Sequence, residues 1–149
     1  MEIVKLNIAQ IDKVESLLIE QFKNEAWNLE QLKSSFNSNS TQFYGIFDVD
    51  KLVCVASILI TPDDINLLDI ATAETHKHKG YAKQLLSFLI SLKNKEQTFS
   101  LEVKSKNIPA INLYTKLGFK TLNIRKKYYK DGDDALCLFL EWWLYNYKV

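Results

Sequence analysis

The sequence predicts one α/β domain, residues 1–149, whose partly antiparallel sheet carries helices on both faces. Strand-like and helix-like segments follow one another in the order β-α-α-β-β-β-α-β-α-β-β. A chain of 149 residues is long enough for one ordinary domain with its own hydrophobic core. With 47% apolar and 25% charged residues, its composition is that of a soluble globular protein.

The first half of the chain predicts two helices flanked by strands. Apolar residues recur at helical spacing between Ala9 and Phe22, which predicts the first helix. The second is predicted to begin at Asn28, because Asn28 and Gln31 resemble a capping box ahead of an apolar stripe. Strands are predicted at 2–7, 42–48, 52–60 and 65–72, with a hairpin turn at 48–51.

The second half predicts two more helices and three strands. One helix opens near Gly80, where apolar residues again mark one face. A shorter helix runs from Asn107 to Leu117, since Asn107 can cap its start and Gly118 suits the position just past its end. Strands are predicted at 98–104, 119–128 and 134–143, with the Asp131-Gly132 pair as the turn between the last two.

Charge and cysteine usage exclude several classes of function. A formal net charge of +1 argues against a general nucleic-acid or membrane-surface binder. Cys54 and Cys137 lie in apolar, strand-like runs and are predicted to be core residues. His76 and His78 have no third ligand nearby, so no metal site is predicted. No signal peptide or membrane span is recognisable, and a cytoplasmic protein is therefore expected.

Residues 70–83 have the clearest chemical character, because a strand passes through a polar loop into a helix. Free backbone N–H groups in such a turn and at a helix start form an anion site. Gly80 and Ala82 lack a bulky side chain that would hold a phosphate away from that backbone. Positive charge would come from Lys77, Lys79 and Lys83. Taken alone, the same residues also fit a basic loop that is simply solvated.

The segment 77–82 resembles the pyrophosphate loop of the GNAT superfamily of acetyltransferases. Gly80 and Ala82 match that loop, whereas Lys77 stands where the superfamily has glutamine or arginine. Within the superfamily the chain is most similar to the RimI-type ribosomal-protein-alanine N-acetyltransferases and related enzymes of protein N-termini. The stretches that carry this closer resemblance are 101–107, 110–119 and 124–136, while residues 1–40 match only in outline.

The resemblance implies the GNAT fold, with a mostly antiparallel seven-stranded sheet that splays between its fourth and fifth strands. It implies acetyl-CoA as co-substrate, held in that gap, and no metal. Backbone groups of 70–72 would bind the pantetheine and polarise the thioester carbonyl. The residues that the resemblance assigns to acetyl-CoA are Ile70, Ala71, Thr72, Lys77, His78, Lys79, Gly80, Tyr81, Ala82, Lys83 and Asn107.

Two residues take catalytic roles by the same resemblance. Strand alternation turns Glu102 away from Leu101 and Val103, and the family places a general base at this position. Tyr114 would return a proton to the thiolate, because a phenol with a pKa near ~10 is protonated at neutral pH. Without the resemblance, Glu102 would be interpreted as a surface ion-pair residue. Tyr114 would be interpreted as an aromatic side chain that packs on its own helix.

The acceptor site is assigned by resemblance to the last predicted hairpin. Tyr128 and Tyr129 match a hairpin that clamps the peptide backbone in N-terminal acetyltransferases, and Trp27 would form the opposite wall. The expected reaction is acetyl transfer to a protein N-terminal α-amine, with a ribosomal protein as the client. A GNAT enzyme of lysine side chains or small amines, and a non-catalytic CoA-binding module, are the alternatives. Oligomeric state and the role of the aromatic tail at 142–147 stay open.

Overall fold

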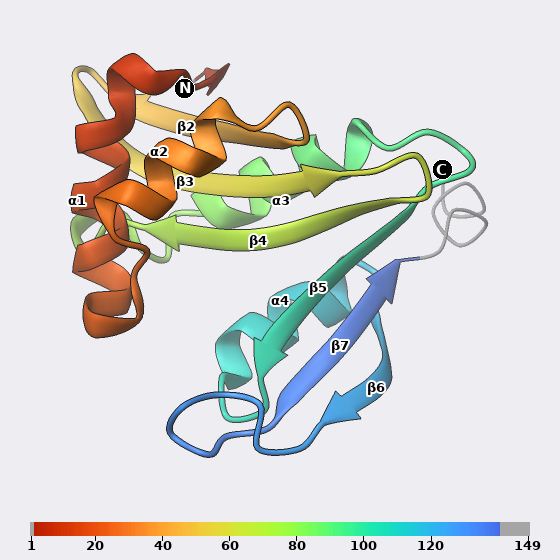
Figure 1. The fold of residues 1–149 in the computed structure, drawn as a ribbon. Helices are drawn as coiled ribbons and strands as arrows, with labels where there is room; N and C mark the ends of the chain where they lie inside the picture. The colour runs from red at the N-terminus through yellow and green to blue at the C-terminus, as the bar shows by residue number, and fades with distance from the viewer. Residues whose placement is uncertain (1, 141–149) are drawn as a thin grey trace. The chain divides into compact units, whose positions relative to one another are not determined.

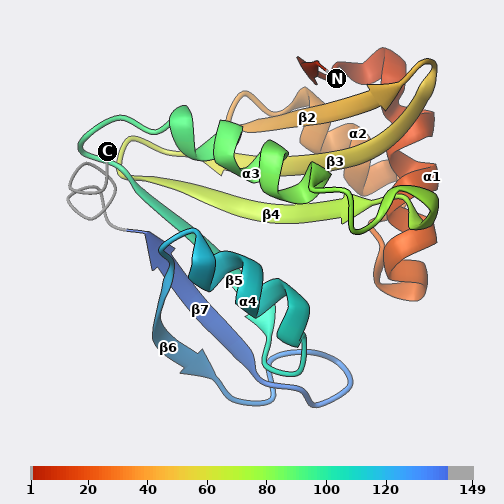
Figure 2. The same ribbon diagram turned by 180° about the vertical axis from the view of Figure 1, so that it is seen from behind.

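A computed structural model describes residues 2–140 of the chain (Figures 1 and 2). In chain order its elements are β1 (Ile3–Lys5), a 3₁₀ helix (Ile8–Gln10), α1 (Ile11–Phe22), a 3₁₀ helix (Lys23–Glu25), α2 (Leu29–Asn37), β2 (Thr41–Asp48), β3 (Lys51–Ile60), β4 (Asp64–Thr72), a 3₁₀ helix (Glu74–His76), α3 (Tyr81–Ser91), β5 (Thr98–Lys104), α4 (Ile108–Lys116), β6 (Lys120–Arg125) and β7 (Ala135–Leu140). No helix in this described part is long and apolar enough to cross a membrane.

The seven strands form one sheet in the order β1-β2-β3-β4-β5-β7-β6. The β1–β2, β2–β3, β5–β7 and β6–β7 pairs are antiparallel, whereas β4 and β5 are parallel. The β4–β5 ladder pairs Asp64–Leu67 with Thr98–Leu101. Both strands continue past it, to Thr72 and Lys104. The predicted mixed, mostly antiparallel sheet is confirmed.

The described chain divides into two compact units. Unit 1 runs up to Ile60 and includes Leu68–Leu89, while unit 2 contains Thr61–Leu67 and the chain from Ile90 onward. In unit 1, α1 and α2 cover one face of the strands and α3 covers the other (Figures 1 and 2). Strand β3 is therefore buried from Leu52 to Ile58. A strand that is covered on both faces needs an almost continuous apolar run, and residues 52–60 supply it.

In unit 2, α4 covers one face of β5, β7 and β6 (Figure 2). Phe119 makes edge-on contacts with Phe99 of β5 and with Tyr114 of α4, at centroid distances of 5.7 and 5.9 Å. No helix among the described residues of unit 2 covers the other face, which we call the open face. The register across β5, β7 and β6 places Glu102, Lys104, Asn123, Arg125, Ala135 and Cys137 on it.

Local signals in the sequence located most of the element boundaries correctly. Asn28 and Gln31 form the predicted capping box at the start of α2. The side chain of Asn107 caps α4 by accepting a hydrogen bond from the backbone N–H of Ala110. Gly118, just past the end of α4, has a φ of 100° that a glycine tolerates best. Both cysteines are buried, as predicted.

Two predicted strands are too long. The strand expected at 2–7 ends at Lys5, because Asn7 is already the cap of a helical turn. The strand expected at 119–128 ends at Arg125, because Lys127 has a φ of 50° and its N–H donates to the Asp134 carboxylate. Of the strand predicted at 134–143, Ala135–Leu140 is confirmed, while residues 141–143 and the aromatic tail lie outside the described residues.

Candidate active site

The predicted anion-binding loop lies in unit 1 between β4 and α3. Its backbone has a positive φ at two places, 63° at His78 and 86° at Gly80. A Cβ at Gly80 would meet no atom within 4 Å, so backbone conformation and not crowding favours glycine here. Helix α3 begins at Tyr81, and the first N–H groups of a helix have no partner within it. The loop therefore combines a left-handed residue, His78, with a helix start whose first N–H groups have no partner within α3.

The lysines around this loop are not equivalent. Lys77 Nζ lies 2.9 Å from a carboxylate oxygen of Glu74, so its charge is already partly neutralised. The same hydrogen bond is the main reason why the pKa of Glu74 is lowered. Lys79 and Lys83 are exposed. The positive charge that all three lysines are expected to add around the loop stays a prediction, with the Lys77 charge shared with Glu74.

At the end of β4, backbone groups are better placed to bind a ligand than the side chains are. Ala71 is buried, and the Thr72 hydroxyl lies 3.5 Å from the buried Cys54 thiol. The hydrogen-bonded pairing of β4 with β5 ends at Leu67. It therefore does not include the backbone groups of 70–72. The binding of acetyl-CoA by backbone groups of these three residues stays a prediction.

Sequence reasoning missed a titratable group next to this strand end. Burial raises the pKa of the Asp69 carboxyl to about 7. A carboxyl in that range exists partly in its neutral form at physiological pH, which is unusual for aspartate. A charged residue inside the apolar run Leu67-Leu68-Asp69-Ile70-Ala71 was the signal that would have pointed to it.

Glu102 lies on the open face of unit 2, as strand alternation predicts. Its Oε1 is 3.7 Å from Nη2 of Arg125 on β6. Its Oε2 is buried and has no hydrogen-bond partner among the described residues. A buried carboxylate oxygen without a donor is costly, so this atom is a ready acceptor for an ammonium group or a water molecule.

Two tyrosines of the β6–β7 connection gather around this carboxylate. Tyr128 and Tyr129 meet edge-on at a centroid distance of 5.1 Å, and Arg125 lies 5.4 Å over the Tyr128 ring. Burial, followed by the negative charge of Glu102, raises the pKa of Tyr129 to about 12. Tyr129 therefore keeps its proton throughout the neutral range. An acid, a cation and two aromatic rings lie together on the open face.

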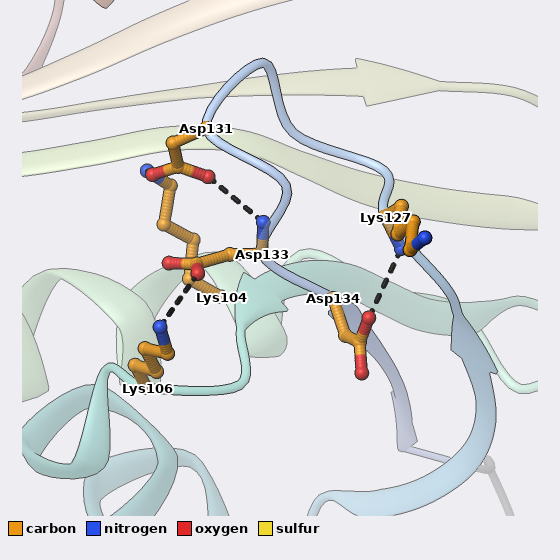
Figure 3. Close-up of polar contacts among 6 residues, drawn as sticks. All are labelled: Lys104, Lys106, Lys127, Asp131, Asp133 and Asp134. Carbon is orange, nitrogen blue, oxygen red and sulfur yellow. Dashed lines mark hydrogen bonds and ion pairs between the residues drawn. The ribbon is translucent and has the colours of Figure 1, made fainter.

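The connection that carries these tyrosines, residues 126–134, is fixed by Lys–Asp contacts (Figure 3). Lys104 of β5 reaches Asp131 at 2.7 Å, Lys106 reaches Asp133 at 3.0 Å, and Lys126 reaches Asp134 at 3.2 Å. Lys104 Nζ also lies 5.1 Å from the ring centroid of Tyr129. Contacts from β5 and from the segment after it thus determine where the connection lies beside Glu102.

These contacts predict how the connection responds to charge removal. Lys104, and then the backbone N–H of Asp133, lowers the pKa of Asp131. A lowered carboxyl pKa stabilises the fold above its unfolded value, and this contribution is lost as pH falls through the folded value. Asp131→Asn is therefore expected to speed amide hydrogen exchange at 126–134 at pH 7 and to change Tm only slightly. Exposed Asp63→Asn is the control, and unchanged exchange in Asp131→Asn would contradict the prediction.

Tyr114 lies away from Glu102. It is only 6% exposed and packs on Phe119, on the side of β5 that α4 covers. Glu102 and Tyr114 are therefore on opposite faces of β5, and the structure does not bring the two side chains together on one face. The remaining candidate, Trp27, is half-buried before α2 in unit 1, so neither unit by itself joins it to Tyr128 and Tyr129.

The sheet order, the loop before α3 and the acid–aromatic cluster define an α/β protein of the acetyltransferase class. The chain belongs to the acetyltransferase (GNAT) family, whose sequence profile matches residues 11–119. It is 33% identical over 116 residues to the [ribosomal protein bS18]-alanine N-acetyltransferase of Escherichia coli K12, covering 72% of this chain and 78% of that one. The crystal structure of the E. coli ribosomal-protein-S18-alanine N-acetyltransferase superposes with a TM-score of 0.85 at 26% identity, covering 93% and 92% of the two chains.

A second group of relatives matches over a shorter stretch. The N-alpha-acetyltransferase of Saccharolobus solfataricus is 42% identical over 73 residues, which is 47% of this chain and 44% of the relative. The chain thus spans less than half the length of this archaeal protein. By name, the archaeal relative is an N-alpha-acetyltransferase and the bacterial one an N-acetyltransferase of an alanine of ribosomal protein bS18.

Proposed function

We propose that the chain transfers the acetyl group of acetyl-CoA to the N-terminal α-amine of a protein, with the N-terminal alanine of a ribosomal protein as the first candidate. The observation that carries this proposal is the unpartnered Glu102 Oε2 beside Tyr128 and Tyr129, in a chain of the GNAT family. The N-alpha- and alanine N-acetyltransferase names of its relatives support the α-amine as acceptor.

The chemistry asks little of the base when the acceptor is an α-amine. Deprotonating an α-amine with a pKa of ~7.7–8 at pH 7 costs about 1 kcal/mol, against about 4–5 kcal/mol for a lysine with a pKa of ~10.4. The nitrogen attacks the thioester carbon, so that a C–N bond forms and the C–S bond breaks. The nitrogen's proton passes to Glu102, directly or through a water.

Glu102 and Tyr114 lie on opposite faces of β5, and we propose that the acceptor amine and acetyl-CoA approach from these two different faces. In this proposal the amine approaches Glu102 from the open face, and the CoA sulfur lies on the α4 side, where Tyr114 returns a proton to the thiolate. The amine nitrogen and the thioester carbon would then meet at the edge of β5 beyond Leu101. Backbone donors of 70–72 would polarise the thioester carbonyl, and the N–H groups of 77–83 would bind the diphosphate.

An acceptor panel tests the proposed function. The protein is incubated with acetyl-CoA and either a peptide with a free N-terminal alanine, the same peptide with a blocked N-terminus and an internal lysine, or a polyamine. Mass spectrometry then records the gain of one acetyl group. We expect transfer to the free α-amine at a rate well above the other two. Preferred acetylation of the lysine or the polyamine would favour the other GNAT functions, and tight CoA binding without transfer would favour the binding module.

The cellular client is tested separately by comparing protein N-termini from cells with and without this protein. One or a few N-termini, a ribosomal protein among them, are expected to lose acetylation. If ribosomal N-termini keep their acetyl groups while others lose them, the ribosomal client is wrong although the reaction stands. If no N-terminus changes, the α-amine acceptor itself is wrong.

A further inference from the structure

A chain of polar contacts in unit 1 joins the segment before the anion-binding loop to the β2–β3 turn. His76 Nε2 lies 2.9 Å from Oδ2 of Asp48, the last residue of β2. His76 Nδ1 lies 2.7 Å from the Thr75 hydroxyl, which in turn accepts a hydrogen bond of 3.4 Å from Lys51 Nζ. Asp48 and Lys51 flank the turn, so its two sides contact consecutive residues of the 3₁₀ helix Glu74–His76.

Elementary hydrogen-bond chemistry orients every member of this network. A carboxylate only accepts, so His76 Nε2 carries the proton that faces Asp48. In the neutral tautomer Nδ1 then accepts from the Thr75 hydroxyl, whose oxygen remains free to accept from the Lys51 ammonium. Each group thus donates a hydrogen bond to the next one, from Lys51 to Thr75, from Thr75 to His76 and from His76 to Asp48. Matched chains of this kind hold side chains in one arrangement.

The imidazole also contacts the far end of the loop. Its ring centroid lies 6.1 Å from that of Tyr81, the first residue of α3. His76 precedes the loop and Tyr81 follows it, so one side chain contacts both ends of 77–80. The His76 side chain is only 14% exposed, which makes it a packed part of unit 1.

The loop needs such support because its backbone is strained. His78 has a φ of 63°, a left-handed conformation that is unfavourable for a residue with a side chain. Strained conformations persist only when the surrounding structure fixes them. The exposed His78 side chain offers little packing of its own, so the support has to come from the flanking residues.

We infer that Lys51, Thr75, His76 and Asp48 form a positioning network that holds the 77–82 loop in the conformation that binds the diphosphate of acetyl-CoA. The inference rests on the proposed function. His76 is a positioning residue in it, because it acts on the loop and not on the reacting atoms. A loop held in its binding conformation before the ligand arrives avoids the ordering cost of binding, which appears as tighter affinity.

The test separates the diphosphate from the rest of the donor. His76→Phe keeps a ring against Tyr81 and removes both hydrogen bonds. We expect its Kd for CoA, measured by calorimetry, and its KM for acetyl-CoA to rise about 5- to 10-fold, the size expected for loss of one or two net hydrogen bonds. The value of kcat at saturating acetyl-CoA and the KM for peptide should not change. Acetyl-pantetheine, which has no diphosphate, should react equally well with wild type and variant.

Two further variants complete the experiment. Asp48→Ala should reproduce the effect of His76→Phe, and the double variant should be little worse than either, since both break one network. Glu30→Gln, which breaks the Glu30–Lys33 contact on α2, is the control and should change nothing. If His76→Phe does not fold, Asp48→Ala and Thr75→Val carry the test.

Each outcome has a distinct meaning. Equal losses with acetyl-CoA and acetyl-pantetheine would show a general structural role and overturn the inference. Unchanged CoA affinity in folded variants of a wild type that binds CoA would also overturn it, while leaving the proposed function intact. A wild type that binds no CoA and transfers no acetyl group would remove the proposed function itself.

Discussion

Replacing Glu102 by glutamine is expected to lower kcat/KM for a peptide acceptor by about 10²- to 10³-fold, the contribution typical of a general base. Glutamine keeps the size and one acceptor oxygen of glutamate but cannot take up the proton of the attacking amine. Because Glu102 lies on the open face, the Kd for acetyl-CoA should stay within about twofold of wild type. Stopped-flow or calorimetric binding and steady-state kinetics measure the two quantities on one preparation.

The pH profile makes this test more specific. If Glu102 takes the proton, part of the lost rate should return as pH rises and solvent deprotonates more of the acceptor α-amine. Exposed Glu96→Gln, in the same unit, is the matched control and should behave as wild type. A Glu102→Gln variant with wild-type kcat/KM at pH 7 would remove Glu102 from the mechanism, and a rise in the Kd for acetyl-CoA alone would make it a donor-binding residue.

The second large effect is expected on stability, from Asp69→Asn. Burial raises the pKa of Asp69 from 3.8 to about 7, so the folded state binds its proton more tightly than the unfolded state does. Between about pH 4 and pH 7 the native protein carries more protons, and its stability therefore falls as pH rises through that window. Asparagine has the size of the neutral acid and does not ionise, so the variant should lack this loss.

The free energy of unfolding measures the effect. Relative to wild type, Asp69→Asn should gain about 1–2 kcal/mol at pH 5 and about 4 kcal/mol at pH 8, since each pKa unit corresponds to about 1.4 kcal/mol. Denaturant unfolding at both pH values gives the difference, with exposed Asp50→Asn as the control for the mere loss of a charge. A difference that is the same at pH 5 and pH 8 would show that Asp69 is not a buried acid of this kind.

The features predicted correctly from sequence depend on neighbours along the chain. A capping box needs only Asn28 and Gln31, and both hydrogen bonds are present. The side of β5 that Glu102 occupies follows from a period of two residues, which every strand obeys. The mostly antiparallel, seven-stranded sheet was predicted through family resemblance, since strand pairing depends on contacts far apart in sequence.

The features that sequence reasoning missed depend on contacts through space. The strand at 119–128 ends early because Asp134 binds the backbone N–H of Lys127. The ammonium group of Lys77 reaches Glu74, a contact that sequence reasoning did not predict. His76, considered only as a metal ligand, is instead held between Asp48 and Thr75. None of these partners can be identified before the backbone conformation that brings the side chains together is known.

By itself, the sequence determined the kinds and order of the elements, the caps of α2 and α4, and the face of β5 that carries Glu102. These are set by local hydrogen bonding and by the periodicity of apolar residues. Only the tertiary structure decided that Tyr114 faces away from Glu102, that Asp69 is buried enough to raise its pKa to about 7, and that Lys104 lies over the ring of Tyr129. Burial and charge pairing depend on which segments pack together, and that is settled only when the whole chain has folded.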